Sequence, residues 1–276
     1  RIQKALEKAK AIHQAQAVPE VKPVQKEEKI KPAVDDPLKG PIDKISYTQT
    51  KVVEITPEML AQKRVIAGIY NNHQSTVFRM LRTQVLTKMR NNDWQTIAIT
   101  SPTAGEGKSL IASNLAVAIA MELNQTVLLV DLDLRNPSVS DYFSLDVDLG
   151  LKDYLEQDIT LTDVLINPSI KRLVILPGKG RAEDSAELLS GPKMARLVSD
   201  IKQQYDSRMI IFDVPPILQT DDVLIAANYF DSTLLVIEDG KNSEDDIVKS
   251  MQLLDGHNLI GTVLNKADTA PTHQNY

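Results

Sequence analysis

The chain has 276 residues, of which 42% are hydrophobic, 25% are charged and none is cysteine. This composition excludes a wholly disordered chain, and the lack of cysteine excludes disulfide scaffolds, thiol catalysis and zinc sites built on thiolates. The formal net charge of -6 is divided unevenly. Residues 1–63 carry 12 Lys/Arg and 9 Asp/Glu, a net of +3, whereas residues 64–276 carry 19 and 28, a net of -9.

Residues 1–63 have the composition of a tail that precedes a folded body. They hold 6 of the 14 prolines and 1 of the 11 glycines, and such a segment cannot bury enough apolar surface to offset its ordering entropy. Within it we predict a short amphipathic helix over about 1–12 and a flexible Pro/Lys-rich linker over about 14–55. That helix would either dock on a partner or an anionic membrane surface, or remain a frayed, solvated helix. Residues 64–276 are predicted to form one domain.

From Gln74 onward, short apolar runs alternate with helical patterns. Continuous Val/Ile/Leu runs indicate strands that are covered on both faces, and strand-helix alternation requires right-handed crossovers. We therefore predict an α/β fold with a doubly wound, mostly parallel sheet that binds ligands at the carboxyl ends of its strands. The predicted strands are 96–100, 127–131, 172–176, 208–214, 233–238 and 259–264, and the predicted helices are about 108–123, 151–165, 192–204, 221–228 and 243–254.

A glycine-containing loop, SPTAGEGKS, connects the strand at 96–100 to the helix that begins near Lys108. Glycines let backbone N–H groups converge on phosphate oxygens, the lysine bridges the β- and γ-phosphates, and the serine hydroxyl ligates magnesium. Pro102 takes the place of the first glycine of the GxxxxGKS pattern, but strand, loop, GKS and helix together still predict a P-loop. The residues predicted to surround the nucleotide are Thr103, Ala104, Gly105, Glu106, Gly107, Lys108, Ser109 and Leu110.

Acidic residues stand at the carboxyl ends of two further predicted strands. Asp131 and Asp133 belong to VLLVDLDLR, and Asp213 ends RMIIFD. Any one of them could cap the next helix. All three beside one phosphate cradle would concentrate negative charge that a cation must offset. We predict that Ser109, Asp131 and Asp213 hold Mg²⁺, with Asp213 as the Walker B residue.

The combination of GKS, VDLDLRNP and FDVPP resembles the bacterial tyrosine kinases of capsule and exopolysaccharide synthesis, the BY-kinases, over about residues 74–268. The helix VFRMLRTQVL, the segment VILPGKG followed by AELL, and GTVLN add to the resemblance. The chain is also similar to the wider MinD/ParA-like P-loop ATPases. Their signature lysine near the start of the P-loop is replaced here by Thr103 or Ala104, which favours the kinases.

This resemblance implies an ATP-dependent protein-tyrosine (auto)kinase that regulates exopolysaccharide or capsule biosynthesis and export, with ATP and Mg²⁺ as cofactors. Lys108, Asp131 and Asp133 would be catalytic. Asp131 would be the base or orienting group for a tyrosine hydroxyl, and Asp133 would support the metal or the acceptor. Asn265 would contact adenine, although NKAD at 265–268 also imitates the guanine-reading motif of GTPases, so GTP stays an alternative.

The resemblance also implies an inner-membrane partner of the polysaccharide co-polymerase, or chain-length regulator, type that activates the kinase. Membrane association would then run only through that partner, and homo-oligomer assembly is left open. Arg79 and Arg82 resemble the family's Glu-x-x-Arg-x-x-Arg oligomerisation motif, but Thr76 replaces the glutamate. The family's terminal tyrosine cluster is reduced to Tyr276. A switch ATPase without tyrosine transfer and a nucleotide-binding scaffold of the export complex are therefore the alternative functions.

Other classes of site and location receive little support from the sequence. The longest apolar runs, such as 115–120 and 126–130, fall far short of the ~20 residues of a membrane span. No secretory leader is recognisable, so we expect a cytoplasmic protein that is peripheral to the inner membrane. The acidic body argues against nucleic-acid binding. The four histidines are scattered without ligand spacing and predict no metal site beyond magnesium.

Overall fold

The computed structural model describes residues 50–69, 73–203 and 208–267. The predicted N-terminal helix, most of the predicted linker, Asp268 and Tyr276 lie outside these residues. The described part contains one eight-stranded sheet in the order β1-β4-β5-β3-β6-β2-β7-β8. Its strands are β1 (Lys51–Val52), β2 (Thr96–Thr100), β3 (Thr126–Asp131), β4 (Ile166–Asn167), β5 (Leu173–Leu176), β6 (Arg208–Asp213), β7 (Ser232–Glu238) and β8 (Leu259–Asn265).

The sheet is parallel except where β4 pairs antiparallel with β5. The six predicted strands are all present, and the predicted doubly wound, mostly parallel α/β fold is confirmed. Strand β2, which leads into the P-loop, lies between β6 and β7. In the register of β3 and β6, Asp131 stands directly opposite Asp213. The strand order thus brings the P-loop and both acidic strand ends to one edge of the sheet.

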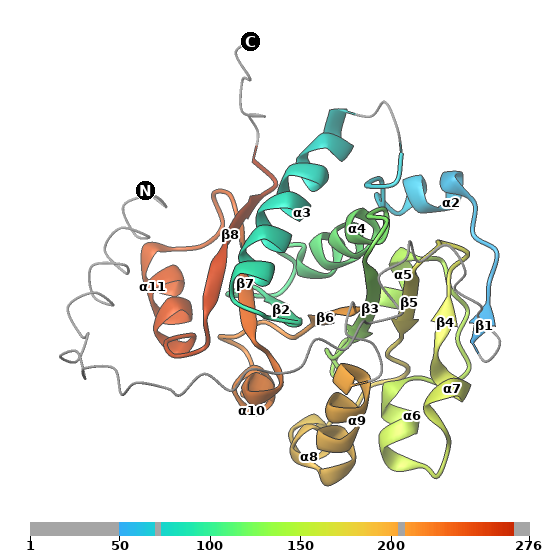
Figure 1. Ribbon diagram of the computed structural model, residues 1–276. Helices are drawn as coiled ribbons and strands as arrows, with labels where there is room; N and C mark the ends of the chain where they lie inside the picture. Colours follow the sequence, from blue (N-terminus) through green and yellow to red (C-terminus); the bar gives the residue numbers. More distant parts are fainter. Residues whose placement is uncertain (1–49, 70–72, 204–207, 268–276) are drawn as a thin grey trace, which may run out of the picture.

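Helices cover both faces of the sheet (Figure 1). Alternate strand residues point to opposite sides, so Ile97 and Ile99 join one hydrophobic core with α3 and α4, whereas Ala98 joins a second core with α8 to α11. The helices are α2 (Pro57–Gln62), α3 (His73–Asn91), α4 (Lys108–Ala120), α5 (Val139–Tyr142), α6 (Leu151–Glu156), α7 (Leu161–Val164), α8 (Ser185–Ser190), α9 (Pro192–Gln203), α10 (Asp222–Ala226), the 3-10 helix η1 (Ala227–Tyr229) and α11 (Glu244–Leu253).

Helix α4 carries the start of the phosphate site and is almost wholly buried, from Lys108 to Ala120 with the exception of Leu110. A helix that is apolar on all sides belongs in the interior of a domain. It packs between α3 and the centre of the sheet, which fixes the direction of its N-terminus. Among the residues that the structure describes, no helix combines the length and the apolar character needed to cross a bilayer.

Several segments differ from the sequence prediction, which did not include α2, α5, α8 or β4. The helix predicted over 151–165 is divided into α6 and α7, because Thr160 and Asp163 form a capping box that starts a new helix. The helix predicted over 221–228 ends at Ala226 and continues as η1. The end of the predicted linker is ordered, since β1 pairs with β4 and Ile55 is buried in the core. The division of the chain at residue 63 stays a prediction.

Candidate active site

The loop between β2 and α4 has the backbone of a phosphate cradle. Gly105 and Gly107 adopt φ angles of 80° and 93°, a region that side chains strongly disfavour. A Cβ at Gly107 would lie 2.2 Å from Asn265 Nδ2, so any other residue would displace the Asn265 side chain and strain the backbone. Gly107 is the N-cap of α4, and no side chain at this position accepts a hydrogen bond from the first-turn N–H groups. The first-turn N–H groups of a long buried helix therefore face the point where an anion would bind.

A buried carboxylate, that of Glu106, fastens this loop to the rest of the domain. Its Oε1 accepts hydrogen bonds from the Thr103 N–H (2.7 Å), the Thr103 hydroxyl (2.6 Å) and the Asn242 amide (2.7 Å). Its Oε2 accepts the Glu238 N–H at 3.3 Å. Glu106 was predicted as a nucleotide-binding residue, but its side chain is used inside the protein, where it shapes the loop and ties it to the end of β7.

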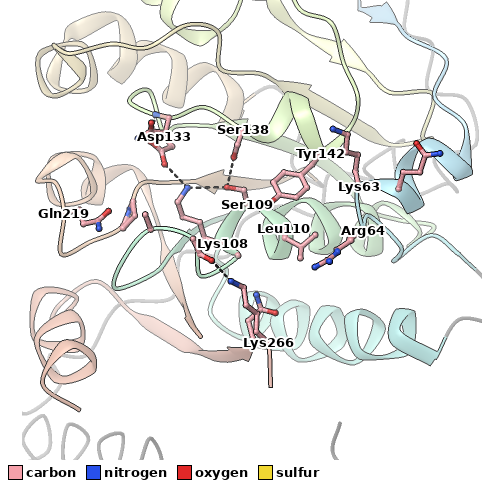
Figure 2. A pocket seen from close by; sticks show the side chains of 17 residues that line it. Lys63, Arg64, Lys108, Ser109, Leu110, Asp133, Ser138, Tyr142, Gln219 and Lys266 are labelled. Carbon is pink, nitrogen blue, oxygen red and sulfur yellow. Dashed lines mark hydrogen bonds and ion pairs between the residues drawn. The ribbon is translucent and has the colours of Figure 1, made fainter. Parts of the chain in front are cut away.

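The Lys108 ammonium lies at the centre of the site (Figure 2). Its Nζ is 2.8 Å from Asp133 Oδ2, 3.5 Å from Asp213 Oδ1 and 3.3 Å from the Ser109 hydroxyl. Burial lowers the pKa of Lys108, but the carboxylates of Asp213 and Asp133 outweigh burial and raise the pKa above its ordinary value. The group therefore stays positively charged at neutral pH and is available to a phosphate.

Asp131 and Asp213 are fully buried beneath this lysine. Asp131 Oδ2 accepts the N–H groups of Ser138 (2.8 Å) and Val139 (2.9 Å), but Asp131 Oδ1 and both Asp213 oxygens have no well-formed hydrogen bond within the described residues. Burial raises the pKa of both carboxyls. The neighbouring Asp213 raises that of Asp131 further, whereas Lys108 counteracts part of the rise at Asp213. Buried carboxylate oxygens that accept no hydrogen bond are suited to a cation.

The donor set fits magnesium only in part. Ser109 Oγ lies beside Lys108 and accepts a hydrogen bond from the Ser138 hydroxyl at 2.9 Å. Over residues 50–69, 73–203 and 208–267, no three Asp, Glu or His side chains converge closely enough to complete a metal site. Mg²⁺ typically keeps several waters and takes one or two carboxylates plus substrate phosphates, so this arrangement suits a metal that arrives with a nucleotide.

A cavity of about 830 Å³ opens above these groups. Of the predicted site residues, those in its wall are Ala104, Gly105, Gly107, Lys108, Ser109, Leu110, Asp133 and Asn265, whereas Thr103, Glu106, Asp131 and Asp213 are not. The residues that sequence reasoning missed are Gln62, Lys63, Arg64, Asn136, Ser138, Tyr142, Pro216, Gln219 and Lys266. Asn136, Pro216 and Lys266 stand inside motifs already singled out, but nothing local marked Lys63, Arg64 or Tyr142.

The start of the NKAD motif lies against the phosphate loop. Asn265 Nδ2 donates to the Glu106 carbonyl at 2.8 Å, and Lys266 Nζ donates to the Gly105 carbonyl at 2.8 Å. Lys266 Nζ also lies 3.1 Å from Glu238 Oε2. These two residues therefore join the end of β8 to the phosphate loop in the wall of the cavity.

The two arginines of the predicted oligomerisation motif have different local roles. Arg79 donates to the Thr76 hydroxyl of its own helix at 2.7 Å. Arg82 reaches α4, where it donates to the Ala118 carbonyl at 3.2 Å and pairs with Glu122 at 3.0 Å. Arg82 thus holds α3 on the phosphate-binding helix. Oligomer assembly through this motif stays a prediction.

Comparison with known proteins places this geometry among nucleotide-binding enzymes. Residues 94–249 match the AAA domain family AAA_31. The chain is 34% identical over 193 residues to the tyrosine-protein kinase YwqD of Bacillus subtilis, which covers 69% of the chain and 80% of YwqD. It is similar in structure to the chimerical protein CapA2B2, with a TM-score of 0.69, 27% identity and 79% and 94% of the two chains covered. It is also similar to the septum site-determining protein MinD of Pyrococcus horikoshii in complex with Mg-ADP, with a TM-score of 0.54, 27% identity and 64% and 72% of the two chains covered.

Proposed function

Since the chain belongs to the bacterial tyrosine-protein kinases and contains an AAA-type nucleotide-binding domain, we propose that it transfers the γ-phosphoryl group of ATP to protein tyrosine and thereby regulates exopolysaccharide or capsule synthesis. The observation that carries this proposal is the Lys108 ammonium held between Asp133 and Asp213 at the start of α4. A charged ammonium, first-turn N–H groups and acidic strand ends at one cavity form the machinery of phosphoryl transfer.

The nucleotide and Mg²⁺ would share the groups at this edge of the sheet. The P-loop N–H groups and Lys108 would hold the β- and γ-phosphates, Ser109 and Asp213 would hold the metal directly or through water, and Asn265 would contact the base. Bound Mg²⁺ supplies positive charge to the phosphate oxygens. Glu106 keeps the loop in the shape that presents its N–H groups, and Asp131 fixes the segment of Ser138 and Val139.

The acceptor tyrosine must lose its phenolic proton as its oxygen attacks the γ-phosphorus and the bond to the leaving ADP oxygen breaks. A phenol has a pKa of about 10, so a carboxylate close to the reacting oxygen assists. Asp133 lines the cavity, whereas Asp131 is fully buried with one oxygen held by two N–H groups. We assign proton acceptance to Asp133 and the orienting role to Asp131.

Labelling with radioactive ATP tests this function. The chain is incubated with Mg²⁺ and labelled ATP, with and without the cytoplasmic segment of the membrane partner, and phosphotyrosine is measured. Lys108→Ala and Asp133→Asn should each lower labelling at least 100-fold, because each removes a group that acts in the transition state. Lys249→Ala, a change on the exposed side of α11, should label like the wild type. Labelling that survives Lys108→Ala would refute the assigned site.

A switch ATPase without tyrosine transfer is the second candidate, and the likeness to MinD favours it. ATP turnover without any phosphotyrosine, controlled by a membrane partner, would support this alternative. Asn265 and Lys266 begin the NKAD motif, which imitates a guanine-reading motif, and both lie against the phosphate loop. The same experiment should therefore measure competition between ATP and GTP for the site. A preference for GTP would overturn the proposed adenine assignment.

The partner and the acceptor are also proposals. The family resemblance implies an activating membrane partner of the polysaccharide co-polymerase type, through which the kinase would reach the inner membrane, and the similarity to the chimerical protein CapA2B2 supports a second polypeptide. Tyr276 is the proposed acceptor near the chain end. Mass spectrometry of the labelled protein tests this choice, and labelling that persists in Tyr276→Phe would place the acceptor elsewhere.

A further inference from the structure

Two cations from outside every recognised motif line the nucleotide cavity. Lys63 and Arg64 follow α2, more than forty residues before the P-loop lysine, and both are wall residues of the cavity. Figure 2 shows Arg64 beside Leu110, and the Tyr142 ring between Ser109 and Lys63. Both side chains are exposed, and neither forms an ion pair with a carboxylate in the described part of the chain.

A buried asparagine of α4 fixes these cations relative to the phosphate cradle. Asn114 Nδ2 donates to the Arg64 carbonyl and to the Leu110 carbonyl, each at 3.0 Å. Its Oδ1 accepts the N–H groups of Ile66 (2.8 Å) and Ala67 (3.1 Å). One fully buried amide thus joins the Arg64 segment to the first turn of the helix that binds phosphate. The backbone of Arg64 is thereby held at a fixed place beside that turn.

The backbone at Arg64 is fixed by the end of helix α2. Its φ is 61°, in the left-handed region that non-glycine residues rarely adopt. The neighbouring Val65 and Ala67 are buried at 1% and 0% exposure, so the segment is anchored on both sides of the Asn114 hydrogen bonds. This conformation ends α2 in a Schellman motif, in which the N–H groups of Arg64 and Val65 donate to the Ala61 and Leu60 carbonyls at 2.9 Å each. The motif fixes the backbone of Arg64 at the cavity wall.

The charges around the cavity leave these two cations in excess. Lys108 already faces Asp133 and Asp213, and Lys266 is paired with Glu238. ATP carries roughly four negative charges at neutral pH, of which one Mg²⁺ neutralises two, and phosphoryl transfer is catalysed largely by neutralising the rest. Of the cations in this wall, Lys63 and Arg64 are those without a carboxylate partner among the described residues.

The pKa of the Tyr142 phenol is shifted by the same charged groups. Burial raises its pKa first, and Asp213 raises it further, whereas Lys108 and Arg64 both lower it. The guanidinium therefore acts electrostatically on the same hydroxyl as the two central groups of the site. This agrees with the position of Arg64 in the cavity wall.

We propose that Arg64, with Lys63 beside it, is a second cationic clamp on the polyphosphate of the bound nucleotide. This role rests on the proposed function in that it assumes a nucleoside triphosphate as the ligand. The link through Asn114 favours the polyphosphate over the acceptor protein, because Arg64 is tied to the turn whose N–H groups bind phosphate. A planar guanidinium also matches phosphate oxygens in geometry and keeps its charge at any physiological pH.

Nucleotide affinity tests the clamp without any acceptor. Dissociation constants of ATP, ADP and AMP, each with Mg²⁺, are measured for the wild type, Arg64→Ala, Arg64→Lys and Lys63→Ala. Arg64→Ala should weaken ATP binding roughly 10- to 100-fold, as for a lost charge-assisted hydrogen bond, and AMP binding much less. Arg64→Lys should restore part of the loss. Arg90→Ala, at the exposed end of α3 outside the cavity, is the matched control and should bind like the wild type.

The results separate this proposal from the kinase assignment. Weaker ATP binding by Arg64→Ala would support the clamp even if the wild type never labelled tyrosine, in which case only the kinase function would fail. Equal losses of affinity for ATP and AMP in Arg64→Ala would overturn the clamp, since the substitution would then affect contacts to the nucleoside or the fold of the protein. Unchanged ATP affinity with a raised KM for an acceptor peptide would also overturn it and would assign the cations to acceptor binding.

Discussion

Removal of the Asp222 carboxylate should loosen the three loops that surround the acidic strand ends. This fully buried group, at the start of α10, accepts hydrogen bonds from Arg135 Nε (3.1 Å), Arg135 Nη2 (3.3 Å) and the Ser185 hydroxyl (2.8 Å). Arg135 stands two residues after Asp133 in the loop that follows β3, and Ser185 begins α8, which follows β5 in the chain. One side chain therefore joins segments that follow three different strands.

The cost should depend on which partner is deleted. In Asp222→Ala the Arg135 side chain, 39% exposed, can turn to water, but the buried Ser185 hydroxyl loses its acceptor. The lost charge-assisted bonds and the unsatisfied hydroxyl together cost about 3 kcal/mol. In Arg135→Ala the Asp222 charge stays buried without its cation, which costs about 3 to 5 kcal/mol. The deletion of the more exposed partner should therefore be the more harmful one.

Thermal and urea unfolding of the two single variants and the double variant measure these differences. A loss of about 3 kcal/mol lowers the Tm of a domain of this size by about 6 to 12 °C. The double variant should lose less than the sum of the single losses, because the second deletion removes the group that the first left unpaired. Phosphorylation should fall as well, since Asp133 shares the loop of Arg135. Additive losses, or a smaller loss in Arg135→Ala than in Asp222→Ala, would contradict this account of the contact.

Three further predictions follow from single contacts. Gly107→Ala should abolish binding of a fluorescent ATP analogue, because its Cβ would lie 2.2 Å from Asn265 Nδ2 at a φ of 93°; binding within threefold of the wild type would show that the loop can rearrange. Glu106→Ala should destabilise the protein by about 2 to 4 kcal/mol in urea unfolding, and Glu106→Gln by about 1 kcal/mol, since glutamine keeps an oxygen for the three donors to Oε1; equal losses would count against this role. Burial raises the pKa of Asp231, but hydrogen bonds from Lys202 and two main-chain N–H groups outweigh it and lower that pKa below the unfolded value of 3.8. Asp231 therefore stabilises the fold above about pH 4 and loses this contribution as the pH falls through the lowered pKa, so Asp231→Asn should cost about 1 kcal/mol at pH 7 and less near pH 3. Urea unfolding between these pH values checks the sign.

The phosphate site illustrates how far the sequence could go. Strand β2 has the predicted bounds of 96–100, and α4 begins at the predicted Lys108. Both depend on local properties: an apolar run of strand length, glycines where φ is positive, and a helix former directly after them. The kinship with tyrosine kinases could likewise be predicted, because its motifs are short and contiguous.

Other features depended on contacts between distant segments. The two-residue strands β1 and β4 have no periodicity of their own and exist only as partners at the edge of the sheet. The sequence could not rank Asp131 and Asp133, because both follow the same strand. Packing buries both, at 0% and 3% exposure, but of the two Asp133 is the one that lines the cavity. The local pattern of a sequence indicates which backbone conformation a segment prefers. It does not indicate which of its side chains other segments will cover.

The amino-acid sequence by itself determined the six main strands and their order along the chain, the phosphate loop and the acidic strand ends, since each follows from the chemistry of neighbouring residues. Only the tertiary structure brought Arg64 to Leu110 through Asn114, Asn265 to the phosphate loop and Asp222 to Arg135. The residues that these contacts bring together lie far apart in the sequence, from 46 positions for Arg64 and Leu110 to 159 positions for Glu106 and Asn265. Their formation depends on the packing of whole elements, which no local pattern encodes.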